Sequence, residues 1–270
     1  PHDFTPNVPY DAARHIGVVM RFDNVKDLRL ANLTLKDPES FAVQLGNIER
    51  FSVEDITFDY NLLRMNMDGI HLNGNCRQGR IANIKGMTND DMIALNADDG
   101  AIAEMSRGPI SDIVVDSIFA ENGYTAVRLL SAGNPVRRVR ISNIFGSYRY
   151  NVVSFTQHQV HPGEPSTFED VAIDGIFCSK PTQPAPVPLA SDEWGRKSAP
   201  LIWIAEGVHA KNVTISNMHR TEMFQNASDS IVVDANAVVD CLTLSNLSLV
   251  NNTSQPISVL TNRGAIHALN

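Results

Sequence analysis

A short repeated phrase constrains the fold of this chain more than any other feature of its sequence. The phrase alternates apolar residues with others, places Asn or a related residue fifth, and then resumes the alternation, as in Leu28-Arg29-Leu30-Ala31-Asn32-Leu33-Thr34-Leu35. Eight copies begin at Leu28, Phe51, Gly79, Ile113, Val139, Val171, Val213 and Leu242. Successive starts lie 23, 28, 34, 26, 32, 42 and 29 residues apart, a range of periods that is typical of a solenoid.

Each copy reads as a β-strand with a bend, because its apolar residues recur with a period of two. The fifth place is Asn in five copies and Asp55, Ser117 or Gly175 in the others. Asn tolerates left-handed backbone, and its side-chain amide can bond to the Asn of the next coil. We therefore expect a ladder of stacked Asn residues at one corner. Asn32 and Asn246 also belong to Asn-X-Ser/Thr sequons, and the ladder should bury them.

A second short apolar segment follows each copy, for example Phe41–Leu45, Gly69–Leu72 and Met92–Leu95. Two or three strands per turn, without a helical pattern between them, predict an all-β fold: a right-handed parallel β-helix of about eight coils in a single domain, residues 1–270. Residues 178–200, with five prolines, should form a long loop on its wall. Nothing before Leu28 resembles a cap, so we expect further chain upstream. A β-sandwich is the alternative, but it would not repeat a corner residue.

Composition excludes several classes of function. The 22 basic and 30 acidic residues give a net charge of −8, which argues against a nucleic-acid partner. No run of 18 apolar residues predicts a membrane span. The three cysteines have no CxxC or CxxH spacing, so no zinc site is indicated. We assign no cofactor and no metal-ligating residue.

The coils should bring carboxylates together on one face. Aligning the second strands on their apolar residues pairs Ile70, Ile93, Val127 and Val152. Two places earlier in each strand stand Asp68, Asp91, Thr125 and Tyr150. Neighbouring strands lie about 4.7–4.9 Å apart, so Asp68 and Asp91 should stack on adjacent coils with Asp90 beside them.

Stacked like charges are unfavourable, and a coil built only for structure would avoid them. Their repulsion should keep at least one of the three carboxyls protonated above the usual pH range. A proton donor beside ionised partners is what glycoside hydrolysis requires. Two other interpretations are a calcium site and a merely solvated group of acids.

The segment Asn66-Met67-Asp68-Gly69-Ile70, followed one coil later by Asn89-Asp90-Asp91-Met92-Ile93-Ala94-Leu95, resembles the polygalacturonase family of glycoside hydrolases. The resemblance covers about residues 20–160. It implies a right-handed β-helix, an inverting reaction on a poly- or oligosaccharide, and a secreted or periplasmic protein. It also implies that Asp91 is the general acid and that Asp68 and Asp90 activate the water, with Asn66 near the substrate.

The chain departs from that family in the next two coils. The family's Gly-His-Gly is replaced by Gly123-Tyr124-Thr125, and its Arg-X-Lys by Val153-Ser154-Phe155. The reaction class therefore transfers better than the galacturonate substrate.

Other residues can replace the missing groups. Arg128 is the best candidate for a substrate-binding cation, although it could equally form a salt bridge to the acids. His71, Tyr124, His158 and His161 are candidates for contact with the sugar, as is Trp194 in the long loop.

Three questions stay open. Asp91 could pair with Asp98 instead, although Asp98-Asp99-Gly100 is also ordinary turn chemistry. Residues 122–163 contain five arginines and no acid, which suits an anionic glycan or simply reflects outward strand positions: Arg128, Arg137, Arg138, Arg140 and Arg149. The rival activities are a polysaccharide lyase with calcium and an arginine base such as Arg128, and a non-catalytic carbohydrate-binding β-helix.

Overall fold

The computed structural model describes residues 17–63, 66–100, 105–158, 165–183 and 199–270. These residues form a right-handed parallel β-helix whose strands belong to two sheets of nine strands each. Sheet A contains the short strands β1 (Met20–Asp23), β3 (Val43–Gly46), β5 (Ile70–Asn73), β7 (Asp91–Asn96), β9 (Thr125–Leu130), β11 (Val153–Thr156), β13 (Ile202–Ile204), β15 (Ile231–Val233) and β17 (Leu260–Asn262). All neighbouring strands are parallel, which excludes the β-sandwich.

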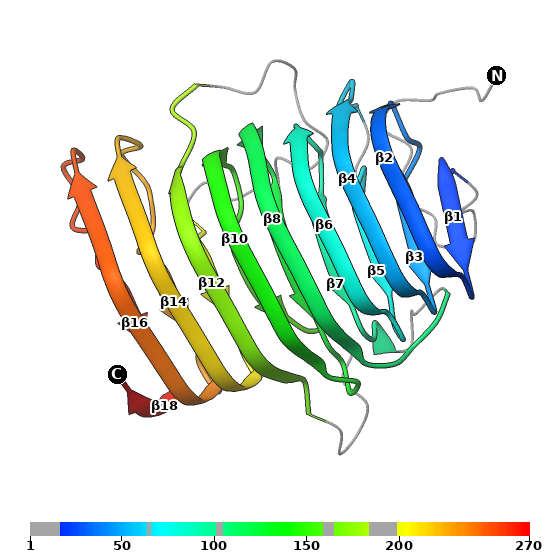
Figure 1. The fold of residues 1–270 in the computed structure, drawn as a ribbon. Helices are drawn as coiled ribbons and strands as arrows, with labels where there is room; N and C mark the ends of the chain where they lie inside the picture. Colours follow the sequence, from blue (N-terminus) through cyan, green and yellow to red (C-terminus); the bar gives the residue numbers. More distant parts are fainter. Residues whose placement is uncertain (1–16, 64–65, 101–104, 159–164, 184–198) are drawn as a thin grey trace.

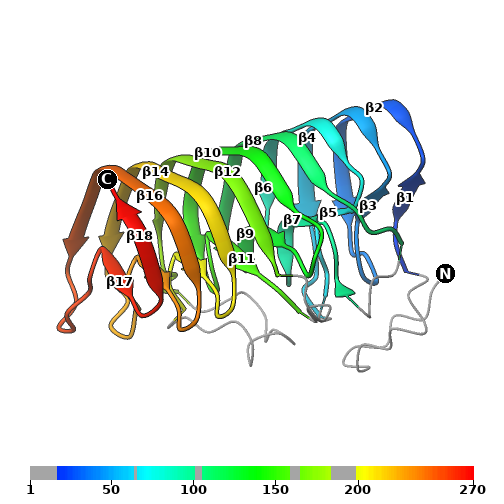
Figure 2. The same ribbon diagram turned by 90° about the horizontal axis from the view of Figure 1, so that it is seen from below.

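Sheet B contains the long strands that carry the repeated phrase, and Figure 1 shows them side by side in chain order. They are β2 (Lys26–Lys36), β4 (Glu49–Asp59), β6 (Arg77–Gly86), β8 (Ile110–Gly123), β10 (Val136–Tyr148), β12 (Thr167–Ser179), β14 (His209–Glu222), β16 (Val238–Asn251) and β18 (Ala265–Leu269). Figure 2 shows the chain winding between the two sheets. Each sheet has one strand beyond the eight predicted segments, since β1 and β18 at the two ends lack the full pattern.

The fifth place of every copy of the phrase adopts left-handed backbone. Its φ lies between 50° and 74° in all eight copies, with Gly175 at 74° and Asn246 at 50°. The Asn246 side-chain amide donates to Oδ1 of Asn217 at 2.6 Å. The predicted ladder is therefore present, but it lies on the outside of the corner. Asn32 and Asn246 are exposed, so the expectation that the ladder buries them is wrong.

A second left-handed position precedes the ladder by five residues and was not predicted. It is occupied by Asp27, Arg50, Gln78, Asp112, Arg138 and Asp170. These residues also pair between coils: Arg50 donates to the two oxygens of Asp27 at 2.7 and 2.9 Å. The residue types at this position differ from coil to coil, so the sequence shows no repeat from which this position could be predicted.

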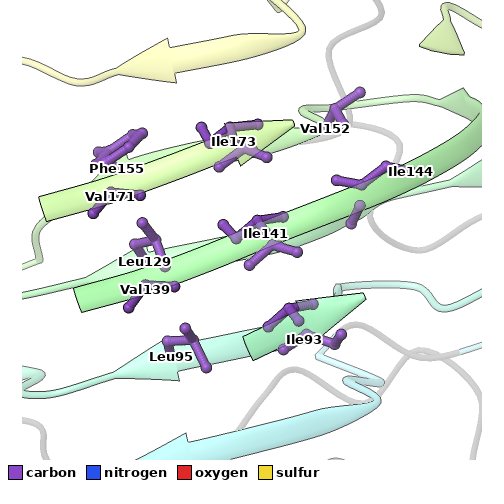
Figure 3. Packing of buried hydrophobic residues seen from close by; sticks show 14 of the residues in the cluster. Ile93, Leu95, Leu129, Val139, Ile141, Ile144, Val152, Phe155, Val171 and Ile173 are labelled. Carbon is purple, nitrogen blue, oxygen red and sulfur yellow. The ribbon is translucent and has the colours of Figure 1, made fainter. Parts of the chain in front are cut away.

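The space between the sheets is filled by aliphatic side chains in register. Ile56, Ile84, Ile118, Ile144 and Ile176 occupy equivalent places on successive strands of sheet B, and all are fully buried. Figure 3 shows such side chains, among them Leu129 from sheet A and Ile141 from sheet B, packed together between the sheets. This core fixes the register that places polar side chains on the outer face of sheet A. The described residues contain no helix that is long and apolar enough to cross a bilayer.

Candidate active site

A groove of about 1120 Å³ runs along the outer face of sheet A. Eight of the residues that the sequence singled out for catalysis or binding line this groove: Asn66, Asp68, His71, Asp90, Asp91, Tyr124, Arg128 and His158. They come from β5, β7 and β9, from the segments directly before these strands, and, for His158, from the segment after β11. Two further candidates, His161 and Trp194, lie outside the described residues.

The strand register stacks the acids as the alignment predicted. Ile70 pairs with Ile93, and the Gly69 amide donates to the Asp91 carbonyl oxygen at 2.9 Å. Asp68 and Asp91 therefore occupy adjacent coils, and each is only 3% exposed. Asp90, the residue directly before β7, is half-buried.

Gly69 allows this close approach. A Cβ at position 69 would lie 2.3 Å from the Met92 carbonyl oxygen and 2.4 Å from the ring of Phe58. Neither atom is the end of a freely moving side chain, so only glycine fits between the coils here. The glycine of the Asn-X-Asp-Gly segment thus keeps Asp68 against the strand that carries Asp91.

Asp68, two residues before β5, forms a pair with His71 on that strand. His71 Nδ1 lies 2.9 Å from Oδ2 of Asp68, and the imidazole stacks on Phe41 with ring centroids 4.4 Å apart. The Asn96 side-chain amide lies 3.1 Å from His71 Nε2. Because that amide nitrogen can only donate, His71 Nε2 accepts and Nδ1 carries the proton toward Asp68.

Arg128 lies at the centre of a second set of contacts. Its guanidinium is 3.5 Å from Oδ2 of Asp91, donates to His158 Nε2 at 2.7 Å, and donates to Thr156 Oγ1 at 2.9 Å. His158 Nδ1 in turn lies 3.1 Å from Oδ1 of Asp99. Arg128 therefore both forms the salt bridge to the acids and faces the groove.

The three acids differ in their electrostatic surroundings. Burial raises the pKa of Asp90 well above its usual value, and the charges of Asp68 and Asp91 raise it further. Burial also raises the pKa of Asp91, but Arg128 and His71 oppose that rise. Asp90 is thus the carboxyl of the pair that most readily keeps its proton.

Arg149, which lies against Tyr124, supports the segment directly before Asp90. The Arg149 guanidinium lies 5.5 Å from the centre of the Tyr124 ring and is 1% exposed. It donates to the Thr88 carbonyl oxygen and to Oδ1 of Asn89, both at 3.4 Å, directly before Asp90. Burial raises the pKa of the Tyr124 hydroxyl, with the nearby charges of Asp90 and Asp91 adding to the effect.

The structure corrects three sequence-based expectations. Val127 pairs with Val153 rather than Val152, so Tyr150 does not occupy the place of Asp68 and Asp91. Asp98 does not line the groove, because it is 1% exposed and accepts from Asn134 and the Gly100 amide, each at 2.7 Å.

The third correction concerns the arginine-rich region. Of its five arginines, only Arg128 lines the groove. Arg138 and Arg140 lie on sheet B, opposite Asp112 and Asp174. The region therefore does not form a positive surface beside the acids.

Sequence reasoning missed the far part of the groove, where Tyr150, Trp203, Glu206, Asp234 and Asn236 contribute to the lining. The available signal was the outward position of Trp203, between two buried residues of an apolar segment. Among the described residues, no group of three His, Cys, Asp or Glu side chains has a geometry that could hold a metal ion.

Residues 10–108, which include Asp68, Asp90 and Asp91, match the model of glycosyl hydrolases family 28. The resemblance to the polygalacturonase-like family of glycoside hydrolases is thus confirmed over that stretch.

A solved structure gives a more distant comparison. The exopolygalacturonase of family 28 from Yersinia enterocolitica aligns with 89% of this chain and 44% of its own, at 11% identity and a TM-score of 0.47. The chain therefore spans less than half of that protein. No curated protein matches the chain.

Proposed function

We propose that this protein hydrolyses glycosidic bonds in a poly- or oligosaccharide by inverting general acid/base catalysis with Asp68, Asp90 and Asp91. The observation that carries the proposal is the convergence of these three carboxyls in one groove, on adjacent coils, with the pKa of Asp90 raised. The family 28 match supports glycosidic bond hydrolysis as the reaction. The same resemblance supports a secreted or periplasmic location.

The electrostatic surroundings of Asp90 and Asp91 favour Asp90 as the general acid, whereas the family resemblance implies Asp91. A general acid must hold its proton at the working pH and reach the leaving oxygen. Asp90 is half-buried and its pKa is raised well above the usual value, whereas Asp91 is 3% exposed and faces Arg128. We therefore assign the proton donor to Asp90.

The remaining two acids then act as bases. The contact with Arg128 stabilises the ionised form of Asp91, and the Nδ1–H of His71 lies against Asp68. Two ionised carboxylates beside each other can activate a water molecule for attack on the anomeric carbon. Asn66, Tyr124, His71, His158 and Arg128 would then contact the sugar from the groove wall.

The proposal is tested by incubating the protein with a panel of glycans: polygalacturonate, methyl-esterified pectin, rhamnogalacturonan, galactan, arabinan, xylan and xyloglucan. Release of reducing ends supports hydrolysis, and proton NMR of the first product reports whether the anomeric configuration inverts. An unsaturated product that absorbs ultraviolet light, with activity lost in EDTA, would instead indicate a lyase with Arg128 as its base. Binding without any cleavage would indicate a carbohydrate-binding module.

A further inference from the structure

The groove continues beyond Arg128 into a region that the acid/base chemistry does not use. Its side chains come from β13, from the turn after β15, and from the segments beside them: Tyr150, Trp203, Glu206, Asp234 and Asn236. The register places Trp203 opposite Ser154, which itself pairs with Arg128. Trp203 therefore continues the row of outward side chains that contains Arg128.

The indole of Trp203 is held from two sides. Its Nε1–H donates to Oδ2 of Asp234 at 3.3 Å, and its ring meets Tyr150 edge to face with centroids 6.2 Å apart. Trp203 is half-buried, while Ile202 and Ile204 on either side are buried in the core. A fixed, partly exposed indole bordering a groove is a usual surface for the apolar face of a sugar ring.

Trp203 lies well away from the catalytic acids. Three strand spacings separate β7 from β13, and each is about 4.8 Å, so the offset along the helix is roughly 14 Å. That distance exceeds the width of one pyranose ring. A sugar unit on Trp203 would therefore belong to the same glycan chain as the scissile bond without being adjacent to it.

The charges of the groove select against an acidic sugar. Among the described lining residues there are six carboxylates and one arginine, Arg128; the carboxylates are Asp68, Asp90, Asp91, Asp99, Glu206 and Asp234. Arg128 is already in contact with Asp91, His158 and Thr156. Arg263 approaches Asp234 at 3.5 Å, but it stands outside the lining and is 59% exposed. A substrate carboxylate at this end would meet negative charge, whereas neutral hydroxyls can donate to it.

We propose that Trp203, together with Glu206, Asp234 and Asn236, forms a distal subsite that binds a neutral sugar unit of the glycan. The inference rests on the proposed function and extends it by naming the substrate as an uncharged glycan at this position. The Asn236 amide donates to Oε1 of Glu206 at 3.2 Å, which orders two polar side chains beside the indole. The subsite thus combines one aromatic face with acceptors for hydroxyl groups.

The test compares wild type with Trp203→Ala on oligomers of two to eight units from each panel glycan, and on oligogalacturonides with their methyl esters. Phe177→Ala is the matched control, because it removes a 45% exposed aromatic ring from sheet B, away from the groove. We expect the loss of kcat/KM in Trp203→Ala to be about tenfold larger for the longest oligomers than for the shortest that is cleaved. Trp203→Phe should recover part of that loss, and Phe177→Ala should show no dependence on length.

The second part of the test concerns substrate charge. It compares each oligogalacturonide with its methyl ester, because the two differ only in esterification. We expect the wild type to cleave neutral oligomers, including the methyl esters where pectic chains are accepted, in preference to the free acids. Preference for the free acids would overturn the neutral-sugar assignment. A length-independent effect of Trp203→Ala, with Asp90→Asn still inactive, would overturn the subsite while leaving the proposed function intact. Absence of cleavage of every glycan by the wild type would overturn both.

Discussion

The two sheets of this β-helix stack carboxylates in opposite electrostatic environments. On sheet B, Arg138 donates to the two oxygens of Asp112 at 2.6 and 2.8 Å, and this hydrogen bond lowers the pKa of Asp112 to about 2. On sheet A, Asp68 and Asp91 lie on adjacent coils, and the pKa of Asp90 beside them is raised well above its usual value. The same winding therefore produces a stabilising stack on one face and a repulsive stack on the other.

The difference between the two sheets shows how the winding of a solenoid determines which charged residues become neighbours. Residues one period apart become neighbours whatever their identity, so the residue types in a column decide between attraction and repulsion. Alternating signs on sheet B need no further partner, because the pairs are exposed and screened. The like charges on sheet A lie beside a groove, where a carboxyl with a raised pKa can act as a proton donor.

The largest expected effect is on turnover. Each of Asp68→Asn, Asp90→Asn and Asp91→Asn should reduce the rate of reducing-end release by about 10²-fold or more, with the β-sheet circular dichroism retained. The matched control is Asp112→Asn, which removes a stacked carboxylate from sheet B and should leave turnover unchanged. Wild-type turnover in any of the first three variants would reject the catalytic role of that residue.

A smaller effect is expected where the coils approach each other most closely. Gly69→Ala introduces a methyl group that meets the Met92 carbonyl oxygen and the Phe58 ring, so Asp68 must shift relative to Asp91. A displacement of about 1 Å at a reacting group can cost 10²-fold in rate, and we expect a loss of at least about tenfold in kcat. Gly46→Ala is the control, because the atoms nearest to its methyl group belong to the side chains of Ser106 and Met105 and not to backbone. Equal kinetics of the two variants would contradict the steric argument.

The pH dependence of stability should have opposite signs on the two sheets. A carboxyl with a raised pKa binds its proton more tightly when folded, so its contribution is present below about pH 3.9 and is lost as pH rises through the raised value. Asp90→Asn should therefore increase the Tm at pH 7, by roughly 2–4 °C for each kcal/mol recovered, and should give no increase at pH 3.

Asp112 should behave in the reverse way. Its pKa is lowered to about 2, so its contribution is present above about pH 3.9 and is lost as pH falls toward 2. Asp112→Asn should lower the Tm at pH 7, within about 1 kcal/mol because the ion pair is largely exposed. Thermal unfolding of both variants at pH 3 and pH 7 checks the comparison, and equal signs at pH 7 would contradict it.

The smallest effect should come from the corner ladder. Asn217 donates to Asp174 at 2.7 Å and accepts from Asn246 at 2.6 Å, with left-handed backbone. Asn217→Ala should cost about 1–2 kcal/mol in urea unfolding, because it loses these bonds and a residue that tolerates positive φ. Asn217→Gly should cost less, since glycine keeps the backbone. Neither should change turnover, and a larger loss in the glycine variant would contradict the backbone part of this account.

The sequence was sufficient to predict the fold and the stacking of the acids, because both follow from the spacing of its repeated segments. Every fifth-place residue is left-handed, and Ile70, Ile93 and Val127 pair in the predicted register. The pairing of Val152 was wrong by one residue. Val152 and Val153 are adjacent and both fully buried, so a period of two cannot choose between them.

Other features of the site depend on contacts that cannot be predicted from the sequence repeat. Trp203 lies several coils from the acids, and its place in the groove follows from the lengths of the intervening loops. The assignment of the proton donor to Asp90 depends on which member of the pair faces Arg128, and this requires coordinates. The sheet B column of Asp27, Arg50 and Asp112 carries no common residue type, so only its backbone conformation identifies it.

The most direct test of the central claim is a measurement of the side-chain carboxyl pKa of Asp90 by carbon NMR titration, in the wild type and in Asp68→Asn. We expect a pKa clearly above the ordinary aspartate value in the wild type and a lower one in the variant, because one of the two neighbouring negative charges is removed. An ordinary pKa for Asp90 that does not change in Asp68→Asn would contradict the account.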